Sequence, residues 1–217
     1  MTYLDLKKTF KINTKLVDQF LDYLIATNEK MNLTAIKNKD EMIEKHIYDS
    51  LLISEVYDFN NKTVLDVGSG AGLPGIPLAI LFPSAHFVLL DATQKKVNYL
   101  KEVIAKLKLK NVEVKCGRVE SLNEKEKYDV IIARALADLP IYLELVTYLA
   151  KINGNIIALK GPNAHEELAK SKKAIQLLNL SLESTQNTNL PNGDKRLNLI
   201  FKKEKAPIEP KEPEEIK

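Results

Sequence analysis

Residues 66–75 read DVGSGAGLPG and directly follow the short apolar run Thr63-Val64-Leu65. Four of the eight glycines in this 217-residue chain lie in the stretch. Glycine has no Cβ, so the backbone can turn tightly there and approach a ligand closely. In an α/β sheet, ligands bind beyond the carboxyl ends of the strands, often at a glycine-rich turn into a helix. The stretch therefore predicts a ligand site at the first strand of such a sheet.

The rest of the chain alternates between strand and helix patterns. The expected strands are 62–68, 85–91, 112–117, 128–134 and 155–160, and the expected helices are 75–83, 93–111, 139–154 and 164–179. Gly154 is expected to cap the third of these helices. Residues 180–188 and 195–203 flank a turn and predict a closing hairpin. The pattern indicates an α/β fold with a seven-stranded, mostly parallel sheet and one antiparallel edge strand.

Three regions differ in composition. Residues 1–60 contain no glycine or proline and show apolar residues at helical spacing, which predicts an N-terminal helical segment. Residues 61–203 form the expected main domain. Residues 204–217 carry three prolines and alternating charges, so we expect a disordered tail.

Composition limits the classes of function. The net charge is only +3, so nucleic-acid binding would need a local basic patch. The single cysteine, Cys116, and three scattered histidines give no metal-ligand spacing, so no metal is expected. No secretion signal or apolar run of about 18 residues is evident, so we expect no membrane span. The default interpretation is a cytoplasmic protein, and we expect a monomer.

Three ligands compete for the glycine-rich turn. A P-loop requires a lysine after its last glycine, and no lysine follows Gly75. A dinucleotide site requires G-x-G-x-x-G, which the spacing of Gly68, Gly70 and Gly72 fits poorly. Asp66 at the mouth of the turn would also repel a pyrophosphate.

S-adenosylmethionine fits better because it carries a sulfonium and an ammonium group and no phosphate. Asp66 then becomes favourable, while Gly68 and Gly70 allow close approach of the backbone. Asp91 ends the second strand, where a carboxylate can accept hydrogen bonds from ribose hydroxyls. Val119 and Glu120 follow the third strand and are candidates for contact with adenine.

Several motifs resemble the RsmG family, also called GidB, of bacterial methyltransferases. The matching stretches are MNLTAI (31–36), HIYDSL (46–51), VLDVGSGAGLPGIPLAI (64–80), LLDATQKKVNYL (89–100), GRVESL (117–122), YDVIIARALADL (128–139) and IALKG (157–161). The resemblance implies a class I S-adenosylmethionine-dependent methyltransferase with a Rossmann-like sheet behind an N-terminal helical segment. It implies methylation of guanine N7 in 16S ribosomal RNA. Its cofactor positions fall on Gly68, Leu73, Val119, Glu120 and Arg134.

Guanine N7 has a free lone pair and no proton to lose, so positioning of the base should suffice without a strong general base. The chain has 29 lysines and only three arginines, which suggests that each arginine stands where a planar guanidinium is needed. The candidates for substrate positioning are Arg118, Arg134, Lys160 and Arg196. We expect these cations to contact O6 or flanking phosphates, because a bidentate contact to O6 and N7 would block the reaction.

Some alternatives stay open. His46 and Asp49 lie one turn apart, and we prefer a structural or cofactor-lid role to a catalytic pair. Few aromatic residues argue against tight binding of bare RNA, so the expected partner is 16S RNA within the small ribosomal subunit or an assembly intermediate. The rival functions are a non-catalytic S-adenosylmethionine-binding regulator, a methyltransferase acting on a small molecule or protein, and an NAD-dependent dehydrogenase.

Overall fold

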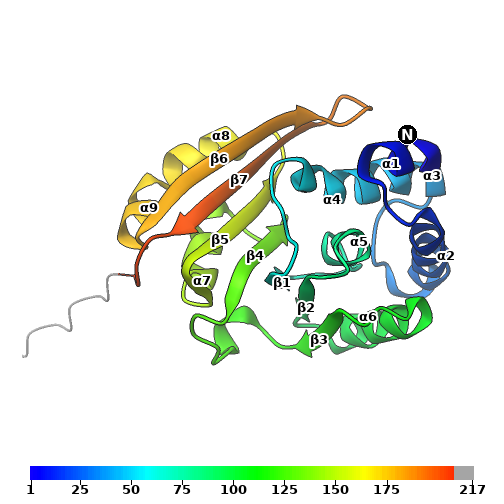
Figure 1. Ribbon diagram of the computed structural model, residues 1–217, viewed down its shortest axis with the longest axis horizontal. Helices are drawn as coiled ribbons and strands as arrows, with labels where there is room; N and C mark the ends of the chain where they lie inside the picture. Colours follow the sequence, from blue (N-terminus) through cyan, green and yellow to red (C-terminus); the bar gives the residue numbers. More distant parts are fainter. Residues whose placement is uncertain (208–217) are drawn as a thin grey trace, which may run out of the picture.

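The computed structural model describes residues 1–207 and begins with a set of helices (Figure 1). They are α1 (Tyr3–Phe10), α2 (Thr14–Met31), α3 (Lys39–Met42), a π-helical turn (Ile43–Tyr48), α4 (Asp49–Leu51) and a 3₁₀ turn (Leu52–Glu55). The first two helices have side-chain N-caps, from Thr2 and Asn13, which satisfy otherwise unpaired backbone N–H groups. The N-terminal region is therefore helical, as the sequence predicts.

Seven strands form one mixed sheet in the order β3-β2-β1-β4-β5-β7-β6. The strands are β1 (Thr63–Val67), β2 (His86–Asp91), β3 (Val112–Cys116), β4 (Tyr128–Arg134), β5 (Ala150–Lys160), β6 (Leu180–Asn189) and β7 (Lys195–Lys203). The first five strands pair in parallel. The antiparallel strand is β7, which pairs with β5 on one side and with β6 on the other. It lies one position inside the sheet, and β6 forms the edge.

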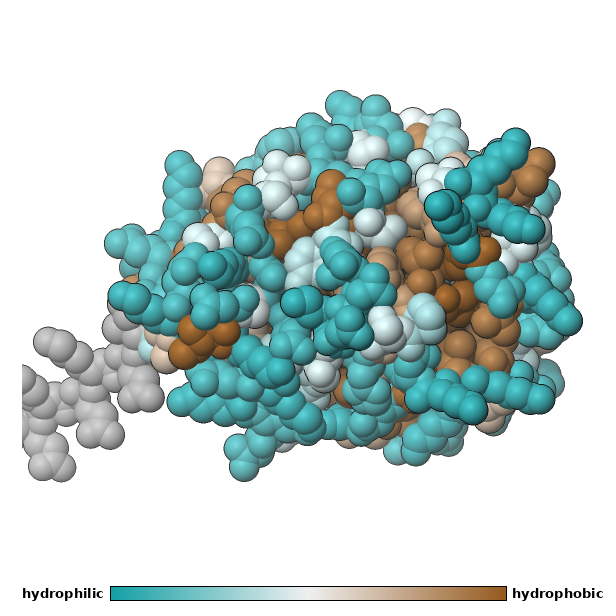
Figure 2. Space-filling model, in the orientation of Figure 1, coloured by the Kyte–Doolittle hydropathy of each residue, from teal (hydrophilic) through white to brown (hydrophobic). Residues whose placement is uncertain are grey.

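Helices cover both faces of the sheet (Figure 1). They are α5 (Gly75–Leu81), α6 (Gln94–Leu107), α7 (Leu139–Val146), α8 (Ala164–Lys170) and α9 (Lys172–Leu177), and a 3₁₀ turn spans Val119–Ser121. One apolar cluster joins the N-terminal helices, α5 and α6 to the sheet, and a second joins α7 to the other face. Figure 2 shows a mainly hydrophilic surface with a hydrophobic area where α2, α5 and α6 meet.

The prediction of one helix over 139–154 is correct only in its first half, and the predicted cap at Gly154 is wrong. The helix ends at Val146, and β5 already begins at Ala150. The register of β4 and β5 shifts here, because Tyr128 pairs with Ala150 whereas Val130 pairs with Asn155. A Cβ on Gly154 would lie 2.9 Å from two backbone oxygens, so glycine fits a crowded, irregular strand rather than a helix end.

The chain stays attached to the sheet beyond β7. The Glu204 N–H donates to the Asn179 carbonyl (2.9 Å), and the Asn179 side chain donates to the Ala206 carbonyl (2.6 Å). Ordered contacts thus continue past residue 203, whereas 208–217, most of the predicted disordered tail, lie outside the described residues. None of the helices within residues 1–207 is long and apolar enough to cross a membrane.

Candidate functional site

The glycine-rich turn leads from β1 to α5 and is fixed by hydrogen bonds to its neighbours. The N–H groups of Gly68 and Ser69 both donate to the Leu90 carbonyl, at 2.8 and 3.0 Å. Gly68 has φ +73°, a conformation that favours glycine, and a Cβ there would lie 2.7 Å from Leu136 Cδ1. The turn therefore presents bare backbone beside the loop that follows β4.

Asp66 lies beneath this turn, not at its mouth as the sequence suggested. Its side chain is fully buried, and Oδ2 accepts the Gly75 N–H at 3.0 Å. Among the described residues, Oδ1 is the one buried side-chain polar atom without a hydrogen-bond partner. Burial raises the pKa of this carboxyl to about 7. Asp66 thus supports the turn and the start of α5 from below.

A cavity of about 250 Å³ opens beyond the ends of β1, β2 and β3. Five predicted residues line it together: Gly68, Asp91, Arg118, Val119 and Glu120. The Asp91 carboxylate accepts hydrogen bonds from Gly70 N (3.0 Å) and Thr93 N (2.8 Å), which orient it at the end of β2. We call this space the first cavity.

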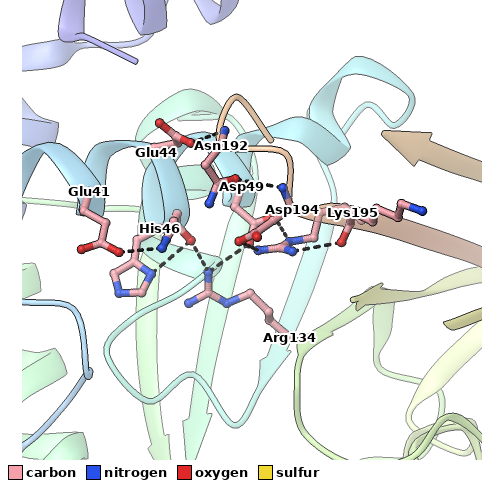
Figure 3. A network of polar contacts seen from close by, with 10 residues as sticks. Glu41, Glu44, His46, Asp49, Arg134, Asn192, Asp194 and Lys195 are labelled. Atoms are coloured by element: carbon pink, nitrogen blue, oxygen red, sulfur yellow. Dashed lines mark hydrogen bonds and ion pairs between the residues drawn. The ribbon is translucent and has the colours of Figure 1, made fainter. Parts of the chain in front are cut away.

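A second cavity of about 370 Å³ lies across the β4–α7 loop. It is lined by Ile36, Lys45, His46, Asp49, Arg134, Ala135, Leu159, Lys160, Gly161 and Arg196. Asp49 connects two of its cations: Oδ1 accepts the Arg196 Nε–H at 2.9 Å, and Oδ2 lies 3.6 Å from Arg134 Nη1 (Figure 3). Three distant parts of the chain therefore meet here.

Lys160 holds the loop that separates the two cavities. Its ammonium donates to the Ala137 carbonyl at 2.5 Å and lies 2.7 Å from Glu167 Oε2, and its side chain is 9% exposed. Glu167 also accepts the Leu139 N–H at 2.8 Å. Ala135, in the same loop, has φ +51°, a strained conformation for a residue with a side chain. The Lys160–Glu167 pair thus stabilises a strained loop that borders both cavities.

His46 is held as a neutral ring. Nδ1 lies 3.2 Å from the Lys45 carbonyl, so it carries the proton, and Nε2 then accepts from the Thr34 hydroxyl at 2.8 Å. Burial and the charge of Arg134 lower the pKa of this imidazole to about 4. Both nitrogens are occupied, which agrees with a structural role rather than proton transfer.

The predicted residues are divided between the two cavities. Arg118 lines the first cavity, whereas Arg134, Lys160 and Arg196 line the second. Among the described residues, Asp66, Gly70 and Leu73 line neither; each supports the turn or the core beneath it. For Asp49 the sequence favoured a structural or cofactor-lid role, and the structure places this residue in the wall of the second cavity. No group of three or more His, Cys, Asp or Glu side chains within residues 1–207 is placed to hold a metal ion.

The first cavity suits the S-adenosylmethionine that the sequence predicts. Its walls combine glycine backbone and apolar side chains with two carboxylates, Asp91 and Glu120. Hydroxyl and amino groups of an adenosine are matched by such acceptors. Asp66 lies beneath the turn and does not line this cavity, so the carboxylates that a ligand would meet are those of Asp91 and Glu120. The residues present therefore fit this cofactor better than a pyrophosphate.

Solved structures of methyltransferases share this fold. The chain is similar in structure to a SAM-dependent methyltransferase from Aquifex aeolicus, with a TM-score of 0.57 and 21% identity, covering 75% of this chain and 93% of that one. It is also similar to M. jannaschii TYW2 in complex with AdoMet, with a TM-score of 0.60 and 17% identity, covering 73% and 76%. The fold is thus that of the class I methyltransferases.

The sequence comparisons are more specific. The model of the GidB family, rRNA small subunit methyltransferase G, matches residues 13–198. Proteins named ribosomal RNA small subunit methyltransferase G are similar across most of the chain. The one from Mesoplasma florum is 42% identical, covering 88% of this chain and 81% of that protein, and the one from Bacillus cytotoxicus is 40% identical, covering 88% and 82%. The chain belongs to this family, which confirms the resemblance seen in its motifs.

Proposed function

We propose that this protein transfers a methyl group from S-adenosylmethionine to N7 of a guanine in 16S ribosomal RNA. The observation that supports this most is the pairing of two cavities across one loop. The first contains Asp91 and Glu120, which suit a nucleoside, and the second contains Arg134 and Arg196, which suit a nucleic-acid ligand. Family membership favours this function over the dehydrogenase alternative.

Each proposed cofactor residue has a role that follows from its position. Asp91 accepts from the ribose hydroxyls, while Val119 and Glu120 contact the adenine. Gly68 gives room for the methionine part, and Gly70 and Leu73 keep the turn in shape. Bound in this way, the cofactor supplies a methyl group made electrophilic by its sulfonium.

The proposed substrate residues position the base instead of activating it. Arg134 and Arg196 present guanidinium groups in the second cavity, and Arg118 stands at the rim of the first. Lys160 acts through the loop, because its ammonium is already bonded to Ala137 and Glu167. Since N7 has no proton, the occupied and neutral His46 does not hinder this reaction.

The natural substrate in this proposal is a folded ribosomal particle in the cytoplasm, and the enzyme acts as a monomer. The chain carries only 14 aromatic residues, eight tyrosines and six phenylalanines, and Tyr99, Tyr128 and Tyr142 are buried. Without an aromatic platform, bare RNA would bind weakly. A folded particle that presents one guanine at its surface would not require the protein to bind and unstack bare RNA.

The proposal is tested with tritium-labelled S-adenosylmethionine and three substrates: small ribosomal subunits, assembly intermediates and stripped 16S RNA. We expect label on one guanine, located by strand scission at 7-methylguanine. Asp91→Asn should reduce transfer at least about tenfold by weakening the ribose contact, whereas Lys173→Ala, on the exposed side of α9, should not change it. Absence of transfer to all three substrates, while the cofactor still binds, would favour the regulator; label at another site would favour a different substrate.

A further inference from the structure

Asp49 is a buried carboxylate with one committed and one uncommitted oxygen. It is the first residue of α4, directly after the π-helical turn, and its side chain is 10% exposed. Oδ1 accepts the Arg196 Nε–H at 2.9 Å. Oδ2 lies 3.6 Å from Arg134 Nη1, which is beyond hydrogen-bond distance. Asp49 is therefore held in place by charge but retains a free acceptor.

That free acceptor faces the second cavity. Within residues 1–207, Asp66 Oδ1 is the one side-chain polar atom that is both shielded from solvent and without a hydrogen-bond partner. Asp49 Oδ2 has no hydrogen-bond partner either, so it must be accessible to solvent. Asp49 and Arg134 both line the second cavity, and Figure 3 shows their side chains pointing toward one another there. A ligand entering this space meets a carboxylate oxygen next to a guanidinium.

Arg134 offers uncommitted donors beside this oxygen. Within the described residues, its guanidinium donates one hydrogen bond, from Nη1 to the Lys45 carbonyl at 3.4 Å. A guanidinium has five N–H donors, so most of them are free. The cavity thus presents an acceptor and donors side by side, in a partly buried place where charge-assisted hydrogen bonds are strong.

This order of groups matches one edge of guanine. Along its Watson–Crick edge, guanine carries an amino group at C2, then N1–H, then the O6 acceptor. The free carboxylate oxygen has two lone pairs, so it can accept from both neighbouring donors while a guanidinium donates to O6. Adenine presents the opposite order at N1 and N6, so it would leave both protein groups unsatisfied. Contacts along this edge also leave N7, on the far side of O6, free to react.

We propose that Asp49 reads the target guanine by accepting hydrogen bonds from N1–H and the C2 amino group, while Arg134 donates to O6. This inference rests on the proposed function and deepens it, since it assigns the choice of base to one carboxylate. Arg196 is then a positioning residue, because its bond to Oδ1 fixes the carboxylate with Oδ2 toward the cavity. Enzymes that modify a base outside its helix commonly read this edge.

The test combines a change in the protein with a change in the substrate. Inosine differs from guanosine only by loss of the C2 amino group, so it retains N7, O6 and N1–H. We expect inosine at the target position to lower kcat/KM of the wild-type enzyme about 10- to 100-fold, the effect of losing a hydrogen bond to a charged group. In Asp49→Ala, transfer to guanosine falls, but guanosine and inosine should then differ by less than about threefold, because the partner of the amino group is gone.

A matched control uses the other carboxylate near Arg196. Asp194 lies 3.9 Å from Arg196 Nη2 on the exposed hairpin, so Asp194→Ala should keep the wild-type preference for guanosine. S-adenosylmethionine affinity of Asp49→Ala should stay within about threefold of wild type, because Asp49 does not line the first cavity.

The possible results separate the inference from the proposed function. Transfer by the wild type to guanosine supports the function whatever the inosine result, and no transfer at all overturns both. Equal wild-type rates on guanosine and inosine would show that no protein group depends on the C2 amino group, which overturns the inference even if Asp49→Ala does not fold. An unchanged preference for guanosine in Asp49→Ala would show that Asp49 only supports the cavity.

Discussion

Replacing Asp66 with asparagine should change how stability depends on pH. Asp66 is fully buried beneath the glycine-rich turn, and burial raises its pKa from 3.8 to about 7. Between about pH 4 and pH 7 the folded protein holds a proton that the unfolded chain has released. Stability from this group is therefore greatest at low pH and decreases as pH rises through 7.

The size of the effect follows from the two pKa values. A difference of about three pH units corresponds to about 4 kcal/mol between the ends of the titration. Between pH 5 and pH 8 the share that can be measured is about 2–3 kcal/mol. The amide of the Asp66→Asn variant has no proton to lose, so the variant should gain this amount relative to wild type across the same range.

The titration of His46 also changes stability with pH, so the unfolding free energies of wild type and Asp66→Asn must be compared at each pH. Its pKa is lowered from 6.5 to about 4, so the unfolded chain holds a proton that the folded protein lacks. This group therefore makes stability rise between about pH 4 and pH 6.5, against the effect of Asp66. The wild-type curve alone can look flat. Because His46 is present in both proteins, the difference between the curves isolates Asp66.

The assay is urea unfolding at pH 5, 6, 7 and 8 for wild type and Asp66→Asn, without added cofactor. The slope of the unfolding free energy against urea should be the same in both proteins, which would show that the unfolded states match. A difference that stays constant within about 0.5 kcal/mol over this range would refute the reasoning. It would mean that Asp66 is ionised in the folded protein despite its burial.

Three other variants test the structure around the cavities. Gly75→Ala should cost about 1–3 kcal/mol of stability in urea unfolding, since its Cβ would lie 2.3 Å from a leucine methyl, whereas Gly161→Ala, with no atom within 4 Å, should be near neutral. Lys160→Met should destabilise the protein by about 3 kcal/mol, whereas Lys170→Met, which removes an exposed ion pair, should have a much smaller effect; equal losses would contradict the role of the buried pair. Arg196→Lys keeps the charge but not the planar guanidinium, so methyl transfer should fall about tenfold with cofactor affinity unchanged. Unaltered transfer would contradict the positioning role of the Arg196 guanidinium.

The sheet was predictable because its signals are local. The strands β1, β2 and β4 are short, mainly apolar runs that end near a glycine or a polar residue, and the helices between the strands keep a helical period. The end of α7 was not predictable in this way. The segment 147–154 is apolar enough for a helix, but pairing of Ala150 with Tyr128 and the crowded site of Gly154 draw it into β5. Tertiary pairing prevailed over local preference.

The first cavity was easier to anticipate than the second. Gly68, Asp91, Val119 and Glu120 lie at or just after strand ends that meet at one edge of the sheet, so their convergence follows from topology. The depth of Asp66 depends on how the turn folds over it, which no spacing reveals.

The second cavity depends on contacts between the two ends of the sequence. Asp49 and Arg196 are 147 positions apart and meet only because the hairpin reaches the N-terminal helices. Glu44 strengthens this closure by accepting the Asn192 N–H at 2.7 Å (Figure 3). The same apolar cluster runs from Leu6 through the helices into β1 and β4, across the predicted boundary at residue 60. The helical segment therefore forms one wall of the second cavity through Ile36, Lys45, His46 and Asp49, whereas the first cavity is lined only by residues between 67 and 145.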